Sequence, residues 1–328
     1  MSLLLVLLTG LLLTACQPSA GEKVYRETRF LFDTEVYIEA YGGASSEDVQ
    51  QAGERAMEQI ATLDQAANFY AADSEITMLN EAAGLETVAL SEDTFALLER
   101  ALEIAELTNG AFNPAVGPFV ELWQTAKTDG VLPTEEEVAL LLPLADYKKI
   151  ELDAAQRTAF LQEEGMSVDL GAIAKGFAVE RAVEILQEGG VESAIVRAGG
   201  NVYALGEKPD GTSWRVGIRN PFQLDETIKF VELHNQAVDT SAIYEQNFSI
   251  NGKEYGHIID PRTGYPAEGT ASSTIITTSP SLADALSTAV FILGHEEGAA
   301  LIETIPETES FIIEVGQGTR SLVPLFFS

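Results

Sequence analysis

Asp284 and Thr288 are the side chains whose types and spacing most directly indicate chemistry. They lie four residues apart in the otherwise largely apolar stretch SLADALSTAVFILG, so on a helix they share one face, one turn apart. Burying a carboxylate without a partner is costly, and a hard cation is a natural partner for two oxygen donors. The alternative is that Asp284 only compensates the helix dipole and Thr288 hydrogen-bonds to its own helix backbone.

His257 is the second candidate, in the loop that precedes this helix. It leads the apolar pair Ile258 and Ile259, and DPRTG then predicts a tight turn after a strand. Strand ends and rigid turns commonly present catalytic side chains, and a histidine can exchange protons near neutral pH. We interpret His257 as a candidate general base. The alternative is a histidine that is satisfied by hydrogen bonds within a sheet.

A third motif is DLGAIAKG, from Asp169 to Gly176. It predicts a strand end that turns sharply into a helix continuing to about Leu186, and it has neither the Walker A nor the GxGxxG spacing. Small residues at a helix start admit a ligand closely, while Asp169 and Lys175 suit a sugar-type hydroxyl and a nearby phosphate. Close packing of a helix on a sheet would explain the same small residues.

Two further segments are candidate ligand contacts. Phe112-Asn113-Pro114 predicts an irregular backbone with free N–H groups and a free Asn113 amide, but its spacing alone favours a purely structural loop. Tyr70 follows an apolar helix and either faces a pocket or is an ordinary half-buried tyrosine.

The helix that carries Asp284 is predicted to begin at Ser279 and Pro280 and to end at Gly294, after a polar spacer that follows Pro266. Alternating residues predict a strand pair over 25–40, and helical periodicity predicts helices over 46–67 and from Ser91 to Thr108. Further predicted strands lie at 149–152, 158–161, 194–196, 202–205, 214–218, 229–233, 237–239, 248–250, 255–259, 311–315 and 322–326. We see no repeats and no low-complexity linker, so the fold class is α+β, a single compact body of mixed or antiparallel sheet with packed helices.

The charge balance excludes one class of partner. With 51 acidic and 19 basic residues the formal net charge is −32, which argues against binding to nucleic acid or to an anionic lipid surface. A phosphate-bearing ligand would also be repelled. A bound divalent cation and a few well-placed basic side chains would have to neutralise it locally.

The N-terminus has the composition of a lipoprotein signal. Residues 1–15 are mostly Leu without an acidic residue, and Leu13-Thr14-Ala15-Cys16 resembles a lipobox, although no Lys or Arg precedes the apolar run. We expect cleavage before Cys16, lipid on that residue, a linker over 16–24 and one domain over 25–328. The protein would then be lipid-anchored to the cell membrane on its extracytoplasmic face.

Three motifs together, DLGAIAKG, HIIDPRTG and ADALSTA, resemble those of the ApbE family of FAD:protein FMN transferases, and SEITMLN, TNGAFNPAVGP and RAGGN extend the resemblance. The resemblance implies a compact α+β fold related to the T-fold, with a cleft for FAD. It implies an Mg²⁺ site made by the Ala172 backbone carbonyl, Asp284 and Thr288. It also implies FAD contacts, which are Phe32, Tyr70, Ala111, Phe112, Asn113, Asp169, Lys175 and Ile258.

The implied activity moves FMN from FAD onto a Thr or Ser hydroxyl of a partner flavoprotein and releases AMP. Departures from the family pattern are Phe32-Asp33-Thr34 in place of Met-Gly-Thr, Asn113 in place of Asp, and Ala242 in place of Gly. Asp284 and His257 are the candidate catalytic residues. Two alternatives use the same site, namely an FAD pyrophosphatase that yields FMN and AMP, and a lipoprotein that binds flavin without reaction.

Overall fold

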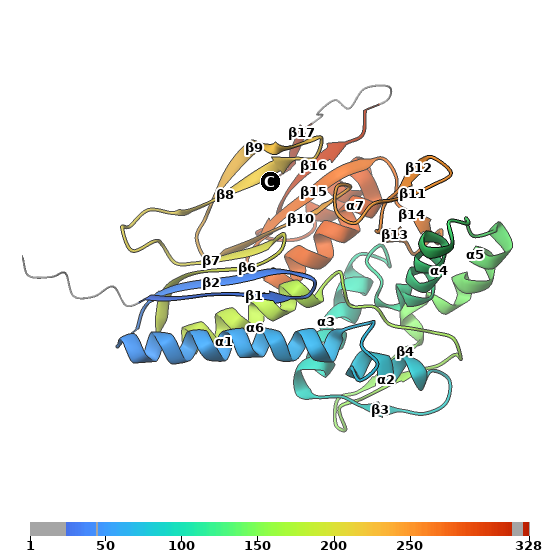
Figure 1. The fold of residues 1–328 in the computed structure, drawn as a ribbon, viewed down its shortest axis with the longest axis horizontal. Helices are drawn as coiled ribbons and strands as arrows, with labels where there is room; N and C mark the ends of the chain where they lie inside the picture. Colours follow the sequence, from blue (N-terminus) through green and yellow to red (C-terminus); the bar gives the residue numbers. More distant parts are fainter. Residues whose placement is uncertain (1–23, 44, 317–323, 328) are drawn as a thin grey trace, which may run out of the picture.

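The computed structural model describes residues 24–43, 45–316 and 324–327, and its centre is a long antiparallel sheet (Figure 1). Every strand pair described in this sheet is antiparallel. The strands, in spatial order, are β1 (Val24–Leu31), β2 (Thr34–Gly42), β6 (Val191–Ala198), β7 (Asn201–Leu205), β10 (Gln236–Ala242), β15 (Thr270–Thr277), β16 (Glu309–Glu314) and β17 (Pro324–Phe327). The α+β class predicted from the sequence is confirmed.

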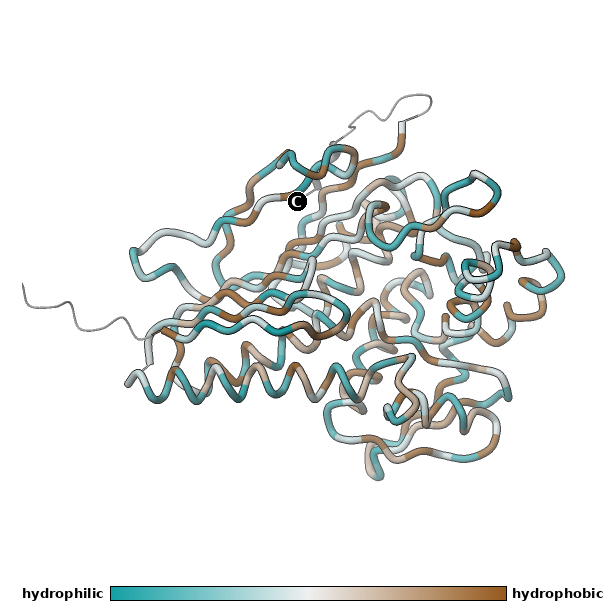
Figure 2. Tube along the Cα trace, in the orientation of Figure 1, coloured by the Kyte–Doolittle hydropathy of each residue, from teal (hydrophilic) through white to brown (hydrophobic). Residues whose placement is uncertain are grey.

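Helices cover one face of the sheet and a hairpin covers the other. The helices are α1 (Ser46–Ala67), α6 (Ala174–Glu188) and α7 (Pro280–Ile302), which bury Ile38, Ala237 and Ile275 of the sheet in the main core. The hairpin is β8 (Trp214–Asn220) and β9 (Gln223–Leu233), which packs on alternate residues such as Val202 and Val238. Hydrophobic and hydrophilic residues accordingly alternate along the strands and along α1 (Figure 2).

Two smaller groups of elements complete the body beside the sheet and its helices (Figure 1). One contains α2 (Glu75–Glu81), α3 (Glu92–Leu107), β3 (Val88–Ala89), β4 (Ile150–Asp153) and β5 (Thr158–Leu161). The other contains α4 (Gly117–Asp129), α5 (Glu135–Leu141), β11 (Phe248–Ile250), β12 (Lys253–Tyr255), β13 (Ile259–Asp260) and β14 (Tyr265–Pro266). The second group has its own apolar core around Phe119 and Trp123.

Capping residues place the helices where the sequence predicts them. The helix predicted over 46–67 is α1, and α3 begins after its N-cap Ser91 and ends before Thr108. α7 begins after Ser279, whose hydroxyl accepts a hydrogen bond from the Leu282 N–H. The predicted end at Gly294 appears as a break inside α7, because Gly294 has φ 72° and the helix resumes beyond it to Ile302.

The prediction of a polar spacer after Pro266 is wrong, because residues 270–277 form β15, which lies between β10 and β16. Its Ser and Thr side chains are the reason for predicting a polar spacer. They are buried in the sheet, where strand position and neighbours outweigh the polarity of a short hydroxyl side chain.

Two other strand predictions are corrected. Residues 166–173 form an irregular loop and turn into α6, with no strand end before Asp169. The strand predicted over 255–259 is divided between β12 and β13, and His257 lies in the irregular segment that joins them. Both segments line the cavity described below, and neither is paired within a sheet there.

By length and apolar composition alone α7 could cross a membrane. It instead packs against β10, β15 and α6, and more than half of its apolar window is buried inside the body. α7 is therefore a core helix. The predicted signal segment 1–15 and Cys16 lie outside the described residues.

Candidate active site

A cavity of about 600 Å³ lies where α7 and the sheet meet α4 and the β11–β14 segment. All candidate site residues that the sequence analysis named in the described part of the chain line this cavity. They come from at least six separate segments. They are Phe32, Tyr70, Ala111, Phe112, Asn113, Asp169, Ala172, Lys175, His257, Ile258, Asp284 and Thr288. The tertiary structure thus brings together residues up to 256 positions apart, from Phe32 to Thr288.

Asp284 is directed at the start of α6. Its side chain is almost completely buried, and its Oδ2 accepts a hydrogen bond of 2.8 Å from the Gly176 N–H. Its Oδ1 lies 3.7 Å from Lys175 Nζ. A carboxylate at the N-terminal end of a helix interacts favourably with the helix dipole, which partly offsets the cost of its burial.

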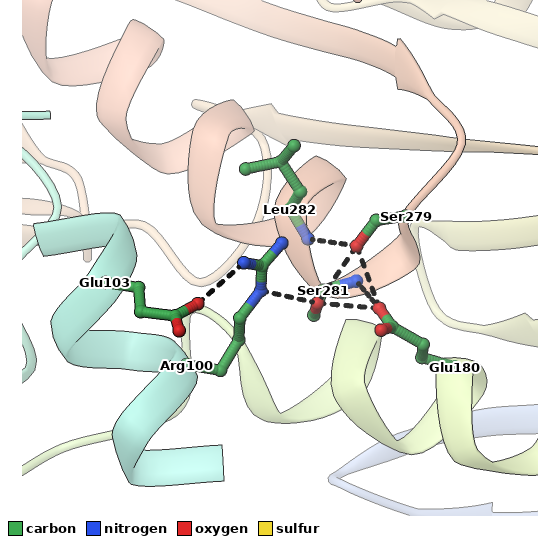
Figure 3. Close-up of polar contacts among 6 residues, drawn as sticks. All are labelled: Arg100, Glu103, Glu180, Ser279, Ser281 and Leu282. Carbon is green, nitrogen blue, oxygen red and sulfur yellow. Dashed lines mark hydrogen bonds and ion pairs between the residues drawn. The ribbon is translucent and has the colours of Figure 1, made fainter. Parts of the chain in front are cut away.

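A hydrogen-bond cluster fixes the N-terminus of α7 against α6 and α3 (Figure 3). Glu180 Oε2 accepts hydrogen bonds from the Ser279 hydroxyl, the Ser281 N–H and the Ser281 hydroxyl, at 2.9, 3.0 and 2.6 Å. Arg100 of α3 donates to the same Ser281 hydroxyl at 3.4 Å. Because Asp284 lies one turn further along α7, this cluster also sets the position of its carboxylate.

Asp284, Thr288 and the Ala172 carbonyl, together with Lys175, are called here the cavity floor, and the three oxygen groups fit a hard cation. Within the described residues the Ala172 carbonyl accepts no hydrogen bond, because the Gly176 N–H that would close the helical turn onto it donates to Asp284 instead. Thr288 Oγ1 has one hydrogen-bond neighbour there, Ser241 Oγ at 3.3 Å. The donor set is therefore one carboxylate, one hydroxyl and one free carbonyl, all oxygen, as Mg²⁺ prefers.

This set differs from a cluster of acidic or imidazole ligands. No group of three or more His, Cys, Asp or Glu side chains suited to a metal occurs among the described residues. A backbone carbonyl and a threonine carry no sequence signature of their own. Only their placement beside Asp284 makes them a candidate site.

Lys175 supplies positive charge at the same floor. Partial burial acts to lower its pKa, but Asp284, Asp239, Glu245 and Asp169 together raise the pKa above its ordinary value. The lysine therefore stays protonated at neutral pH. Its Nζ also donates to the Gly171 carbonyl at 2.9 Å, which fixes the ammonium group beside the loop that precedes α6.

Asp239 is a cavity residue to which the sequence analysis assigned no role. It is almost completely buried on β10, and burial together with Asp284 raises its pKa well above the ordinary value. A single Asp in the buried strand QAVDTSA was the available signal, because an acidic residue in a covered strand needs a partner.

His257 contacts the cavity from the segment between β12 and β13. Its pKa is lowered to about 4, chiefly because surrounding protein displaces water from the ring, while a hydrogen bond with the Glu245 backbone acts in the opposite direction. The imidazole is therefore neutral at pH 7, the form that can accept a proton.

Aromatic side chains, among them Phe32 and Tyr70, also line the cavity. Phe32 and Asp33 form the β1–β2 turn, both with positive φ, and the Phe32 N–H donates to Asp64 Oδ1 at 2.9 Å. Tyr70 is 67% exposed at the rim and contacts the Phe69 ring edge-to-face. A planar ring system could lie between these surfaces.

The free polar groups considered for the Asn113 loop are contradicted, and the alternative of a purely structural loop is confirmed. The Asn113 amide donates to the Ala145 carbonyl at 2.9 Å and accepts from the Ala115 N–H at 2.8 Å. The N–H groups of Ala111 and Phe112 donate to Thr108. The loop is an internally bonded wall of the cavity, since buried polar groups are satisfied within the protein first.

Comparisons with known proteins agree with this geometry. The ApbE family model matches residues 32–312. The chain is 34% identical to the FAD:protein FMN transferase of Treponema pallidum (strain Nichols), over 91% of this chain and 87% of the relative. It is 31% identical to the FAD:protein FMN transferase of Vibrio cholerae, over 96% and 95%.

Solved structures give the same result. A crystal structure of the ApbE protein from Thermotoga maritima superposes with a TM-score of 0.80 at 33% identity, covering 89% of this chain and 94% of that one. The flavin transferase ApbE from Vibrio cholerae superposes with a TM-score of 0.79 at 27% identity, covering 94% and 98%. Fold, site and sequence lead to one conclusion: this chain belongs to the ApbE family.

Proposed function

We propose that this protein is an enzyme that transfers FMN from FAD to a Thr or Ser hydroxyl of an acceptor flavoprotein and releases AMP. The observation that carries the proposal is one cavity in which Asp284, Thr288, the free Ala172 carbonyl and Lys175 meet a neutral His257. Its relatives are named for FMN transfer from FAD. The cavity volume of about 600 Å³ is in the range of sites that hold a cofactor-sized ligand.

In the proposed reaction the acceptor oxygen forms a bond to the phosphorus of the FMN half. The bond from that phosphorus to the oxygen that bridges to AMP breaks, and AMP leaves with the bridging oxygen. The proton of the acceptor hydroxyl passes to the neutral His257 ring. A general base of this kind contributes about 10²- to 10⁴-fold to a rate.

Lys175 and a cation held by Asp284 would bind the diphosphate. Lys175 contributes one positive charge close to Asp284. Asp284, Thr288 and the Ala172 carbonyl would hold Mg²⁺, which when bound offsets negative charge on the phosphate oxygens. The aromatic side chains of Phe32 and Tyr70 would contact the flavin ring, while Ala111, Phe112, Asn113, Asp169 and Ile258 would form the remaining FAD contacts.

The test is incubation of the purified protein with FAD, Mg²⁺ and a membrane-protein extract of the source organism. We expect an acceptor band that remains fluorescent after denaturation, an added FMN mass on one of its Thr or Ser residues, and AMP in equal amount. Free FMN and AMP without an adduct would establish a pyrophosphatase instead. Intact FAD would establish a flavin-binding protein without activity.

Asp284→Ala tests the assignment of the site within this assay. We expect loss of metal-dependent FMN transfer, by at least about 10²-fold, while the protein stays folded. Asp284→Asn is the matched variant, because its amide oxygen still accepts the Gly176 N–H while the charge is gone. Full activity in either folded variant would refute the role of Asp284.

We further propose that lipid on Cys16 anchors the protein to the extracytoplasmic face of the cell membrane. This proposal is supported by the sequence Leu13-Thr14-Ala15-Cys16 after an apolar run. The acceptor flavoprotein would then be a protein of the same membrane surface.

A further inference from the structure

Four side-chain oxygens form a continuous hydrogen-bonded chain from the cavity floor into the core. Thr288 Oγ1 lies 3.3 Å from Ser241 Oγ, and Ser241 Oγ lies 2.8 Å from Ser287 Oγ. The Ser287 hydroxyl in turn contacts Asp239 Oδ2 and the Asp284 carbonyl, the latter at 2.9 Å. Thr288 and Ser241 line the cavity, whereas Ser287 is fully buried behind them.

The strand and the helix place these residues by their periodicities. Asp239 and Ser241 are two residues apart on β10, so both face α7, whereas Thr240 faces the other way and bonds Thr274 of β15 at 2.8 Å. α7 packs directly on β10 and presents Ser287 and Thr288 to this face. The chain therefore connects two elements that both border the cavity.

The number of hydroxyl hydrogens fixes which group donates in each bond of this hydrogen-bonded chain. Each hydroxyl has one hydrogen to donate, while an ionised carboxylate and a backbone carbonyl only accept. The Asp284 backbone carbonyl, which can only accept, lies 2.9 Å from Ser287 Oγ. Whether Ser287 donates to Asp239 or to the Asp284 carbonyl, its hydrogen is used, so Ser241 must donate to Ser287, and Thr288 must donate to Ser241.

The consequence concerns the Thr288 oxygen. If its hydrogen is directed toward Ser241, its lone pairs are left for the cavity, which is the orientation that a cation requires of a hydroxyl ligand. We propose that Ser241 and Ser287 are positioning residues that orient the Thr288 hydroxyl as a cation ligand. The inference depends on the cation site of the proposed function and adds residues for which the sequence analysis predicted no role.

The test measures cation affinity and not catalysis. Mn²⁺ is titrated into the purified protein without FAD and followed by electron paramagnetic resonance, for wild type, Thr288→Val, Ser241→Ala and the double variant. We expect Thr288→Val to weaken Mn²⁺ binding by about 10-fold and Ser241→Ala by about 3- to 10-fold, the range of one hydrogen bond. The double variant should bind as Thr288→Val alone does, because Ser241 acts only through the Thr288 hydroxyl.

Ser273→Ala is the matched control. Ser273 is opposite Ser241 on the neighbouring strand β15 and is fully buried, whereas Ser241 is half-buried. The Ser273 Oγ has no hydrogen-bond partner among the described residues. Its removal should leave Mn²⁺ affinity unchanged. Ser287→Ala should resemble Ser241→Ala if its melting temperature shows that it is folded.

The outcomes separate the two proposals. If Thr288→Val weakens Mn²⁺ binding but Ser241→Ala does not, or if their effects multiply in the double variant, the positioning role is overturned and the cation site stands. If Thr288→Val binds Mn²⁺ as wild type does, or wild type binds none, the cation site itself is overturned.

Discussion

Lys175 shows at the residue scale how a protein with a net charge of −32 can offer a site to a diphosphate. The carboxylates of Asp284, Asp239, Glu245 and Asp169 raise the pKa of its ammonium, so it remains charged although partly buried. These four carboxyl groups outnumber the single ammonium group of Lys175. The floor of the cavity is therefore a place where a cation is favoured, and an anion binds well only together with one.

His257 leads to a prediction about stability and pH. The unfolded chain has a histidine pKa near 6.5, and in the folded protein the pKa is lowered to about 4. Below pH 6.5 the unfolded state therefore binds the proton more readily, so His257 contributes stability that is fully present above pH 6.5 and is lost as pH falls toward 4.

His257→Gln should remove this contribution. Compared with the variant, wild type should lose more of its free energy of unfolding between pH 6.5 and 4, as measured by urea denaturation at several pH values. The loss should be well below about 1.4 kcal/mol per pKa unit, because the ring still contacts solvent in the cavity. Parallel pH curves for the two proteins would contradict the lowered pKa.

At the scale of elements, the approach of α6 to α7 decides where Asp284 lies. Gly176 is the contact point, because a Cβ there would lie 2.4 Å from the Pro280 carbonyl oxygen and 2.7 Å from Asp284 Cβ. One turn later Glu180 binds the first residues of α7. The two helices are thus fixed to each other by two contacts, one at Gly176 and one at Glu180.

Gly176→Ala should force α6 and α7 apart. We expect a destabilisation of about 1–3 kcal/mol from overpacking, together with weaker cation binding, because the bond from the Gly176 N–H to Asp284 is displaced. Thermal unfolding and Mn²⁺ titration measure the two effects.

Gly298→Ala is the control within α7. Its added Cβ would meet the terminal Val290 Cγ1 at 2.9 Å, which a side-chain rotation can relieve, and alanine favours the helix by about 1 kcal/mol. Its cation affinity should equal that of wild type. If Gly176→Ala also leaves cation affinity unchanged, the close approach has no role in placing Asp284.

At the scale of the whole molecule, charge and anchoring are connected. A formal charge of −32 opposes adsorption to an anionic bilayer, and α7, the one described helix long and apolar enough to span a membrane, is a core helix. Stable attachment to a membrane would therefore have to come from the N-terminal lipid. One lipid-bearing residue is sufficient for this only if it carries more than one acyl chain.

Cys16→Ser removes the predicted attachment point. We expect the variant to partition into the aqueous phase of a detergent phase separation, whereas wild type partitions into the detergent phase. The domain over 25–328 should bind Mn²⁺ equally in both proteins. A serine variant that remains in the detergent phase would show that another feature holds the protein at the membrane.

Local signals explain most of the successful predictions. Ser91 and Ser279 are N-caps because their hydroxyls accept an N–H of the first helical turn, an interaction complete within four residues of chain. Spacing alone placed Asp284 and Thr288 on one face of α7, and both line the cavity. The family motifs, compared as strings of residues, named the other lining residues.

The errors arise where residues distant in the chain decide whether a segment pairs in a sheet or whether a polar group is hydrogen-bonded. β15 is a strand because β10 and β16 bond both of its edges, and no window of its own Ser-rich sequence contains that information. The Asn113 amide is occupied because Ala145, 32 residues away, lies beside it.

Caps, periodicity and motifs are properties of neighbouring residues, so they were enough to predict where the main helices begin, the candidate donors and the family resemblance. Only the tertiary structure decided that the Gly176 N–H binds Asp284 and leaves the Ala172 carbonyl free. It likewise joined Thr288 through hydrogen bonds to Ser241, Ser287 and Asp239. The physical reason is that a hydrogen bond depends on position in space, and packing, not sequence separation, sets that position.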